Sequence, residues 1–260
     1  MRFIDKVKEI YQYRHMLFTL VKQDLQGRYK GSVFGFLWTL LNPLFMLLIY
    51  SVVFQFVFKS GIEHYPIYLF VSLMPWNAFN SMIGGGTTCA SNNASILKKV
   101  YFPREIIPIS ITTSQLVNFL ITCIIMAVFI IFSGVGFSVH ALLFPLLVLI
   151  QYILILGLTF ILSALTVFVR DIDHFVSVIL MLGFYATPIV YQGEMLPKKF
   201  QIFLKLNPMA QLVEAYRSIL YYHRMPDMTM LIIWGLGSIA LLVIGYLIFK
   251  KLEKSFVEEL

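Results

Sequence analysis

The densest group of potentially reactive side chains lies in the segment Arg170–His174, which holds Asp171, Asp173 and His174. Carboxylate and imidazole groups are metal ligands, so this segment could bind a metal ion. Clusters this short are common, however, and acidic residues also cap helices in tight turns. We therefore favour helix capping, in a turn on which a partner presses. A metal site is about five times less favoured.

Two further patterns lack the residues that would complete a reactive site. Gly84–Gly86 could cradle a phosphate group, but no Gly-Lys-Ser/Thr follows it, and the chain contains no Walker A pattern. Cys89 and Cys123 lie far apart with no CxxC spacing, so they indicate neither metal nor redox chemistry. No carboxylate pair and no Ser/His/Asp set converges on one predicted face, which disfavours a membrane enzyme.

The composition predicts a polytopic membrane protein. Hydrophobic residues make up 59% of the 260 residues and charged residues only 13%, whereas soluble domains carry about 25% charged residues. The net charge of +7 does not indicate nucleic acid as a partner, because the basic residues cluster at the ends of apolar segments. That distribution is typical of topology signals and of contacts with anionic lipids. The basic N-terminus has no apolar h-region, so we expect no cleavable signal peptide.

Hydropathy predicts an all-α fold with six transmembrane helices. The segments are Phe34–Phe58, Tyr65–Met82, Ile106–Phe132, Val139–Val169, Phe175–Tyr191 and Thr229–Phe249. Asn42-Pro43 should bend the first segment, and Gly84–Gly86 should end the second. The whole chain is expected to form one transmembrane domain, with an interfacial segment over residues 1–33, a six-span bundle over 34–250 and a tail over 251–260. Within the interfacial segment, Ile10–Lys30 mixes apolar and basic residues at helical spacing, as helices in the membrane interface do.

The distribution of basic residues predicts the orientation. Six spans place both termini on one side, and that side carries fourteen of the 20 Lys and Arg residues. Both termini are therefore expected in the cytoplasm. No Asp, Glu, Lys or Arg lies within the predicted spans. Because ion-driven carriers need ionisable groups inside the membrane, the driving force should come from elsewhere.

The spans contain a few polar and aromatic residues that could meet a substrate. Gln115, Asn118 and Gln151 are expected to bond across helix interfaces rather than to bind a ligand. Aromatic residues recur along one face of the first span and include Phe34, Trp38 and Phe45. They could stack on sugar rings, although packing against lipid is favoured by about two to one.

The region between the fifth and sixth spans is predicted to lie outside and to fold back into the membrane. Residues 192–228 are charged but half apolar, which a bilayer tolerates only against protein or a water-filled cavity. Lys198–Tyr222 should form a helical pair with its bend at Asn207-Pro208. Glu214 and Arg217 are spaced to pair at i, i+3.

Several motifs, in order along nearly the whole chain, resemble the permease subunits of type 2 ABC exporters that move O-antigen, capsule or teichoic acid chains. They are Asp24–Ser32 with Gly35, Trp38 and Asn42–Leu44, then Phe102–Glu105 with Pro108, Arg170-Asp171, Thr187–Tyr191, and Asn207–Met209 with Glu214 and Arg217. The resemblance implies a homodimer in the bacterial cytoplasmic (inner) membrane, bound to two copies of a separate ATPase. This chain would then hold no cofactor, and ATP and Mg would bind to the ATPase.

The resemblance also implies roles for individual residues. Coupling to the ATPase would fall to Asn92, Lys98, Lys99, Tyr101, Arg104, Glu105, Arg170, Asp171 and Asp173. Arg28, Tyr29 and Lys30 would border the entry of an undecaprenyl-diphosphate-linked glycan, where basic groups suit a diphosphate. Phe34, Trp38 and Phe45 would line the channel. An extracytoplasmic gate would contain Pro188, Tyr191, Asn207, Pro208, Glu214 and Arg217.

The sequence thus favours a membrane subunit of an ATP-driven polysaccharide exporter. A permease of the same fold for a drug or a small lipid is one alternative, and an ion-driven secondary carrier is another. Nothing in the sequence identifies the sugar.

Overall fold

The computed structural model describes residues 3–27, 30–32, 34–53 and 61–259, and these residues form helices and turns without a strand. The elements are α1 (Phe3–Gln12), α2 (Arg14–Gly27), η1 (Gly35–Leu37), α3 (Trp38–Val52), α4 (Tyr65–Thr87), α5 (Cys89–Asn92), α6 (Ala94–Lys99), α7 (Ile106–Phe132), η3 (Val139–Leu143), α8 (Phe144–Phe168), α9 (Asp171–Ala186), η4 (Gly193–Met195), α10 (Lys198–Leu206), α11 (Pro208–Leu220), α12 (Met228–Leu252), η5 (Glu253–Ser255) and α13 (Phe256–Glu259). The prediction of an all-α fold is confirmed for this part of the chain.

Three helical segments are long and apolar enough to cross a membrane: Ile106–Phe132, Val139–Phe168 and Met228–Ser255. They correspond to the third, fourth and sixth predicted spans, so the chain is a membrane protein. The fifth predicted span, Phe175–Tyr191, is not confirmed as a membrane crossing: the helix there, α9, has 16 residues, begins at Asp171 and ends at Ala186. Pro188 follows two residues later, where it cannot continue the helix.

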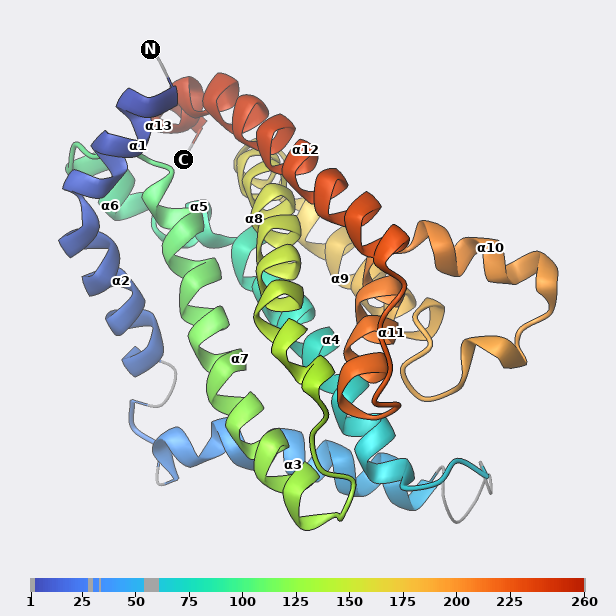
Figure 1. Ribbon diagram of the computed structural model, residues 1–260. Coiled ribbons are helices and arrows are strands. Elements are labelled where there is room, and N and C mark those ends of the chain that lie inside the picture. The colour runs from blue at the N-terminus through green and yellow to red at the C-terminus, as the bar shows by residue number, and fades with distance from the viewer. Residues whose placement is uncertain (1–2, 28–29, 33, 54–60, 260) are drawn as a thin grey trace.

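The first predicted span, Phe34–Phe58, is not confirmed as a membrane crossing. Its described helix, α3, has 15 residues, about 22 Å of helix, which is shorter than a hydrocarbon core of about 30 Å. Figure 1 shows α3 running across the direction of α4 and α7 rather than beside them. Residues 54–58 of the prediction lie outside the described residues.

The prediction that Gly84–Gly86 ends the second span is wrong, because α4 continues through these glycines to Thr87. A Cβ atom added to Gly86 would lie 2.5 Å from Cγ2 of Thr159 on α8. The missing side chain therefore lets α4 and α8 approach closely.

The N-terminal segment forms two helices instead of one, with a break at Tyr13. Figure 1 shows α2 beside α7, and the Ser114 hydroxyl on α7 donates a hydrogen bond of 2.5 Å to Asp24 Oδ2 on α2. The helix predicted to lie in the interface is thus attached to the flank of the bundle.

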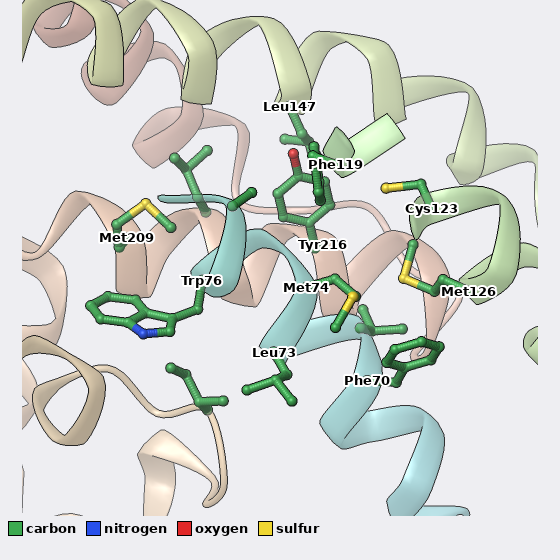
Figure 2. Close-up of a cluster of buried hydrophobic side chains, with 14 of the residues drawn as sticks. Phe70, Leu73, Met74, Trp76, Phe119, Cys123, Met126, Leu147, Met209 and Tyr216 are labelled. Carbon is green, nitrogen blue, oxygen red and sulfur yellow. The ribbon is translucent and has the colours of Figure 1, made fainter. Parts of the chain in front are cut away.

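The core of the bundle surrounds α4. Figure 2 shows Leu73, Met74 and Trp76 of this helix among side chains from α7, α8 and α11, including Phe119 and Tyr216. A second apolar cluster lies near the two termini, where Phe249 packs between Phe160 and Phe256. In Figure 1 both termini lie at the same end, α10 projects from the side of the bundle, and α11 packs inside it.

Candidate functional site

Arg217 on α11 is fully buried in the bundle, and its guanidinium has partners on three segments. Nη2 donates a hydrogen bond of 2.7 Å to the Ile189 carbonyl, and Nε donates to the hydroxyl of Ser72 on α4. The guanidinium carbon lies 3.9 Å from the ring centroid of Tyr68, a cation–π contact. Arg217 therefore joins α11, α4 and the segment after α9.

The predicted ion pair between Glu214 and Arg217 is confirmed. Glu214 Oε2 lies 3.7 Å from Arg217 Nη1, and Oε1 of the same carboxylate lies 3.2 Å from Arg224. Burial lowers the pKa of the Arg217 guanidinium, while Tyr68 and Glu214 raise it. Arg217 Nη1 is buried without a hydrogen-bond acceptor, so the nearby Glu214 carboxylate is what balances its positive charge. The two arginines thus share one carboxylate, and only Arg217 is buried.

The segment 187–191 is held by four side chains from neighbouring elements. Tyr65 donates to the Val190 carbonyl at 3.1 Å, and Tyr68 donates to the Tyr191 carbonyl at 2.8 Å. With Arg217 on the Ile189 carbonyl, three consecutive carbonyl groups have side-chain donors. The Asn207 amide donates to the Thr187 hydroxyl at 3.1 Å. The three bonds to carbonyl groups satisfy backbone acceptors that no helix or sheet serves.

A cleft of ≈ 240 Å³ opens beside this segment. Its lining includes Tyr68, Pro188, Glu194, Lys205, Gln211, Glu214 and Tyr222. The six residues predicted for the gate, Pro188, Tyr191, Asn207, Pro208, Glu214 and Arg217, therefore belong to one structural cluster around α11 and segment 187–191. Sequence reasoning missed Tyr65, Tyr68 and Ser72. Their spacing along α4, at i, i+3 and i+7, was the available signal for a shared face.

The residues predicted to couple to an ATPase lie toward the end of the bundle that carries the termini. Asn92, Arg170 and Asp173 line one cleft there, together with Thr88 and Glu259. The structure thus brings the segments 88–94 and 166–173 together, although about 75 residues separate them in the sequence. Asp171 is exposed in the first turn of α9, where a carboxylate interacts favourably with the helix dipole.

The capping role expected for this acidic turn is not found, because α9 has Arg170 at its N-cap and no side-chain capping bond. Among the described residues, no three His, Cys, Asp or Glu side chains converge as metal ligands would.

The five other predicted coupling residues divide into an exposed group and a group that bonds within the chain. Lys98 and Lys99 are exposed at the end of α6, and Tyr101 is 96% exposed. Glu105 is instead fully buried and lies 3.2 Å from Lys250 Nζ. A buried carboxylate cannot meet a partner protein directly, so the structure gives Glu105 a role within the chain. Arg104 joins it there by donating to the Glu253 carbonyl, which ties the start of α7 to the end of α12.

The remaining predicted site residues are at the N-terminal end. Arg28 and Tyr29 lie outside the described residues, and Lys30 is exposed beyond α2. Phe34 and Trp38 form an edge-to-face pair with ring centroids 5.7 Å apart, while Phe45 is 52% exposed. Trp38 also lines a second cleft, between α3, α4 and α7.

Comparison with known families decides what kind of protein this arrangement belongs to. The model of the ABC-2 type transporter family matches residues 15–221. The chain belongs to the ABC-2 type transporter family. The matched range of this ABC-2 type chain includes the Arg217 cluster and the segments 88–94 and 166–173, and it ends before α12.

Individual relatives are similar over almost their whole length. The O-antigen export system permease protein RfbA of Myxococcus xanthus is 39% identical over 259 residues, which is 99% of this ABC-2 type chain and 100% of the relative. Two Klebsiella pneumoniae proteins of the same name are each 35% identical over 244 residues, 94% of this chain and 94% of the relative.

Proposed function

We propose that this chain is the membrane subunit of an ATP-driven exporter that moves undecaprenyl-diphosphate-linked polysaccharide, such as O-antigen, across the bacterial inner membrane. The observation that carries the proposal is the full-length similarity to O-antigen export permeases, at 39% identity from end to end. The chain offers no Walker A pattern, which agrees with a transport subunit whose energy comes from a separate ATPase.

The ATPase partner is proposed to bind at the end of the bundle that carries both termini. The cleft lined by Asn92, Arg170 and Asp173 lies there, and exposed Lys98, Lys99 and Tyr101 belong to the neighbouring segment. These residues form a polar surface next to apolar spans, as a docking site for a soluble subunit requires. We place this end in the cytoplasm, ATP and Mg on the ATPase, and no cofactor on this chain.

The Arg217 cluster is proposed to serve as the extracytoplasmic gate. Helices α10 and α11 cover the segment predicted to fold back into the membrane, and α11 is buried against α4 and α8. Because Arg217 and Asn207 bind segment 187–191 directly, a movement of α9 would reach α11 through these bonds. We propose further that two copies of the chain enclose the channel. Exposed apolar residues along α9, such as Ile179 and Leu182, would then lie near the partner copy.

Deletion of the gene in a strain that makes the polysaccharide tests the proposal. We expect surface polysaccharide to be lost and undecaprenyl-linked glycan to accumulate in the cytoplasm, with recovery when the gene is restored. Intact surface polysaccharide, together with loss of efflux of a drug or a small lipid, would instead identify the alternative permease. Transport by the purified chain without nucleotide would identify an ion-driven carrier.

Charge reversal at Asp171 tests the coupling surface. Asp171→Lys should abolish export while the permease still inserts into the membrane, because Asp171 is exposed where the ATPase is expected to bind. Glu63→Lys is the matched control, since Glu63 precedes α4 in the loop after the first predicted span and its side chain is 89% exposed. Normal export by Asp171→Lys would remove Asp171 from the coupling surface.

In the same assay, Arg28→Glu should weaken engagement of the lipid-linked substrate.

A further inference from the structure

A cleft of ≈ 320 Å³ lies between α3, α4 and α7, and its polar lining consists mainly of side-chain amides. The lining residues are Trp38, Asn42, Pro43, Met46, Met74, Asn77, Ala78, Asn80, Ser81, Gln115, Asn118, Phe119 and Thr122. Five of these carry amides and two carry hydroxyls, and none carries a charge. The cleft lies against the central parts of α4 and α7, which are apolar helices elsewhere.

Two of the side-chain amides lack a hydrogen-bond partner in the part of the chain that the structure describes. Gln115 is only 5% exposed and its side-chain amide makes no hydrogen bond there, and Asn118 Oδ1 is buried with no bonding partner. Gln151, in the adjacent helix, shows the opposite arrangement. Its amide donates to the Pro75 carbonyl at 2.8 Å and accepts from the Tyr216 hydroxyl at 3.0 Å.

The expectation that all three amides bond across helix interfaces is thus confirmed for Gln151 and not for Gln115 or Asn118. Buried polar groups in proteins are normally bonded, because leaving them unpaired is unfavourable. Gln151 is satisfied by the protein itself. The amides of Gln115 and Asn118 line a cleft, so their missing partners are groups that enter it.

The chemistry of the lining selects the kind of group that fits. Each amide offers both donors and acceptors, and so does each hydroxyl group of a sugar. A diphosphate would find no cation among the lining residues, and an acyl chain would desolvate the amides without bonding them. Trp38, Pro43 and Met46 supply apolar surface at one side, against which the C–H face of a sugar ring can pack. An uncharged sugar unit therefore matches the cleft.

We propose that this amide cleft binds sugar units of the glycan as the chain passes through the permease. The inference rests on the proposed function, since it names a site for that substrate. Asn42, Asn80 and Ser81 are exposed at its mouth, while Gln115 and Thr122 lie at its buried side. Because amides bond hydroxyl groups of any orientation, the cleft can accept successive sugars of one polysaccharide.

Photo-cross-linking in living cells tests the occupant. A benzophenone amino acid placed at Asn80, at the mouth of the cleft, should cross-link to the strain's own polysaccharide, detected with antiserum against it. The same amino acid at Ile124 is the control, because Ile124 is 65% exposed on α7 and does not line the cleft. Cross-links from Asn80 only to lipid, or only to a second copy of the permease, would overturn the proposal.

Replacement of the amides by leucine tests the site, because a purely structural role of the amides predicts a lower Tm and a substrate-binding role does not. The double variant Gln115→Leu/Asn118→Leu should lower export at least about fivefold, the factor that one lost hydrogen bond corresponds to. Its Tm in detergent should stay the same or rise, because two unpaired amides are removed. Gln151→Leu should lower the Tm, since two bonds inside the protein are broken. Gln23→Leu, on the exposed part of α2, should change neither quantity.

The outcomes separate this inference from the proposed function. Normal surface polysaccharide in the deletion strain would contradict the proposed function itself. Loss of polysaccharide on deletion, combined with normal export by Gln115→Leu/Asn118→Leu, would contradict the amide cleft alone. A lowered Tm for that double variant would assign the amides to the fold and would also contradict the inference.

Discussion

Arg217 is a charged side chain with no exposed surface, which is rare because moving a charge out of water is unfavourable. Its position is explained by the groups around it: a hydroxyl, a backbone carbonyl, an aromatic ring and a carboxylate. An arginine suits such a site, because its planar guanidinium donates in several directions at once and can stack on a ring. A lysine would offer a compact ammonium group in place of the planar fork, and it would not stack on the Tyr68 ring in the same way.

Substitution of Arg217 should destabilise the fold much more than substitution of Arg224, although both pair with Glu214. In Arg217→Met, Ser72 and the Ile189 carbonyl lose a charged donor, which we expect to cost about 3 kcal/mol of unfolding free energy. Arg224 is largely exposed, so Arg224→Met should cost about 0–1 kcal/mol. Thermal unfolding in detergent measures the difference, expected as a fall in Tm of about 5–10 °C for Arg217→Met alone. Equal Tm values for the two variants would contradict the assignment.

The sequence indicated only part of this cluster. Glu214 and Arg217 could be paired from their helical spacing, because neighbours on a helix are fixed by its geometry. Ser72 and Tyr68 could not be added, since about 145 residues separate them from Arg217 and no local pattern joins two helices. The burial of Glu105 was missed for the same reason: its partner Lys250 belongs to the last span.

At the scale of elements, Asn207 links the start of α11 to segment 187–191. Its side-chain oxygen accepts from the backbone N–H groups of Met209 and Ala210, and its amide nitrogen donates to Thr187. Asn207 therefore caps a helix and holds a loop with one side chain, and the two tasks can be separated by substitution.

Asn207→Ala should lower the unfolding free energy by about 2 kcal/mol, because both the cap and the bond to Thr187 are lost. Serine also caps helices but is too short to reach Thr187, so Asn207→Ser should cost about 1 kcal/mol. Chemical or thermal unfolding of the three purified proteins gives the order wild type, Ser, Ala. If the Ser variant unfolded like the Ala variant, the capping bonds would contribute nothing measurable.

Helices α8 and α12 cross where two glycines face each other. A Cβ atom on Gly245 would lie 2.2 Å from the carbonyl oxygen of Gly157, and one on Gly157 would lie 2.7 Å from the backbone nitrogen of Leu242. Backbone atoms cannot move aside as a flexible side chain can. Close approach through small residues is a common way for membrane helices to associate.

Gly245→Ala should therefore force α8 and α12 apart and reduce the amount of folded permease in the membrane. Gly235→Ala on the same helix is the control, since its Cβ would meet Ile150 at an ordinary 3.7 Å. That variant should be at least as stable as wild type, because alanine favours a helix by about 1 kcal/mol over glycine. Fluorescence-detected size exclusion of the tagged proteins measures the amount of folded permease for both variants. Normal folding of Gly245→Ala would show that this crossing tolerates a wider separation.

Element boundaries marked by glycine were the least predictable part of the fold. The run Gly84–Gly86 predicts a helix end, yet Gly86 instead permits contact with Thr159 on another helix. The two roles look alike in a sequence. The apolar segments Ile106–Phe132, Val139–Val169 and Thr229–Phe249 were predicted well, since length and hydropathy alone define such helices.

At the scale of the whole molecule, the structure gathers the termini, segments 88–105 and the turn at Arg170 toward one end of the bundle. Figure 1 shows the N- and C-termini close together there. Seven of the fourteen basic residues expected in the cytoplasm belong to segments 88–105, the turn at Arg170 and the C-terminal segment: Lys98, Lys99, Arg104, Arg170, Lys250, Lys251 and Lys254. Charge distribution along the sequence thus agrees with the arrangement of the helices in space, although it could not predict which loops touch.

Labelling of single cysteines tests the orientation that these charges predict. Burial raises the pKa of the Cys89 thiol to about 12, so almost none is reactive thiolate at pH 7, and Cys123 is also buried. The native cysteines can therefore stay in place. A membrane-impermeant maleimide should label Lys199→Cys, exposed on α10, in intact spheroplasts. It should label Lys254→Cys, exposed in η5, only after the membrane is permeabilised. The unsubstituted protein is the control, and the reverse pattern would place the termini outside.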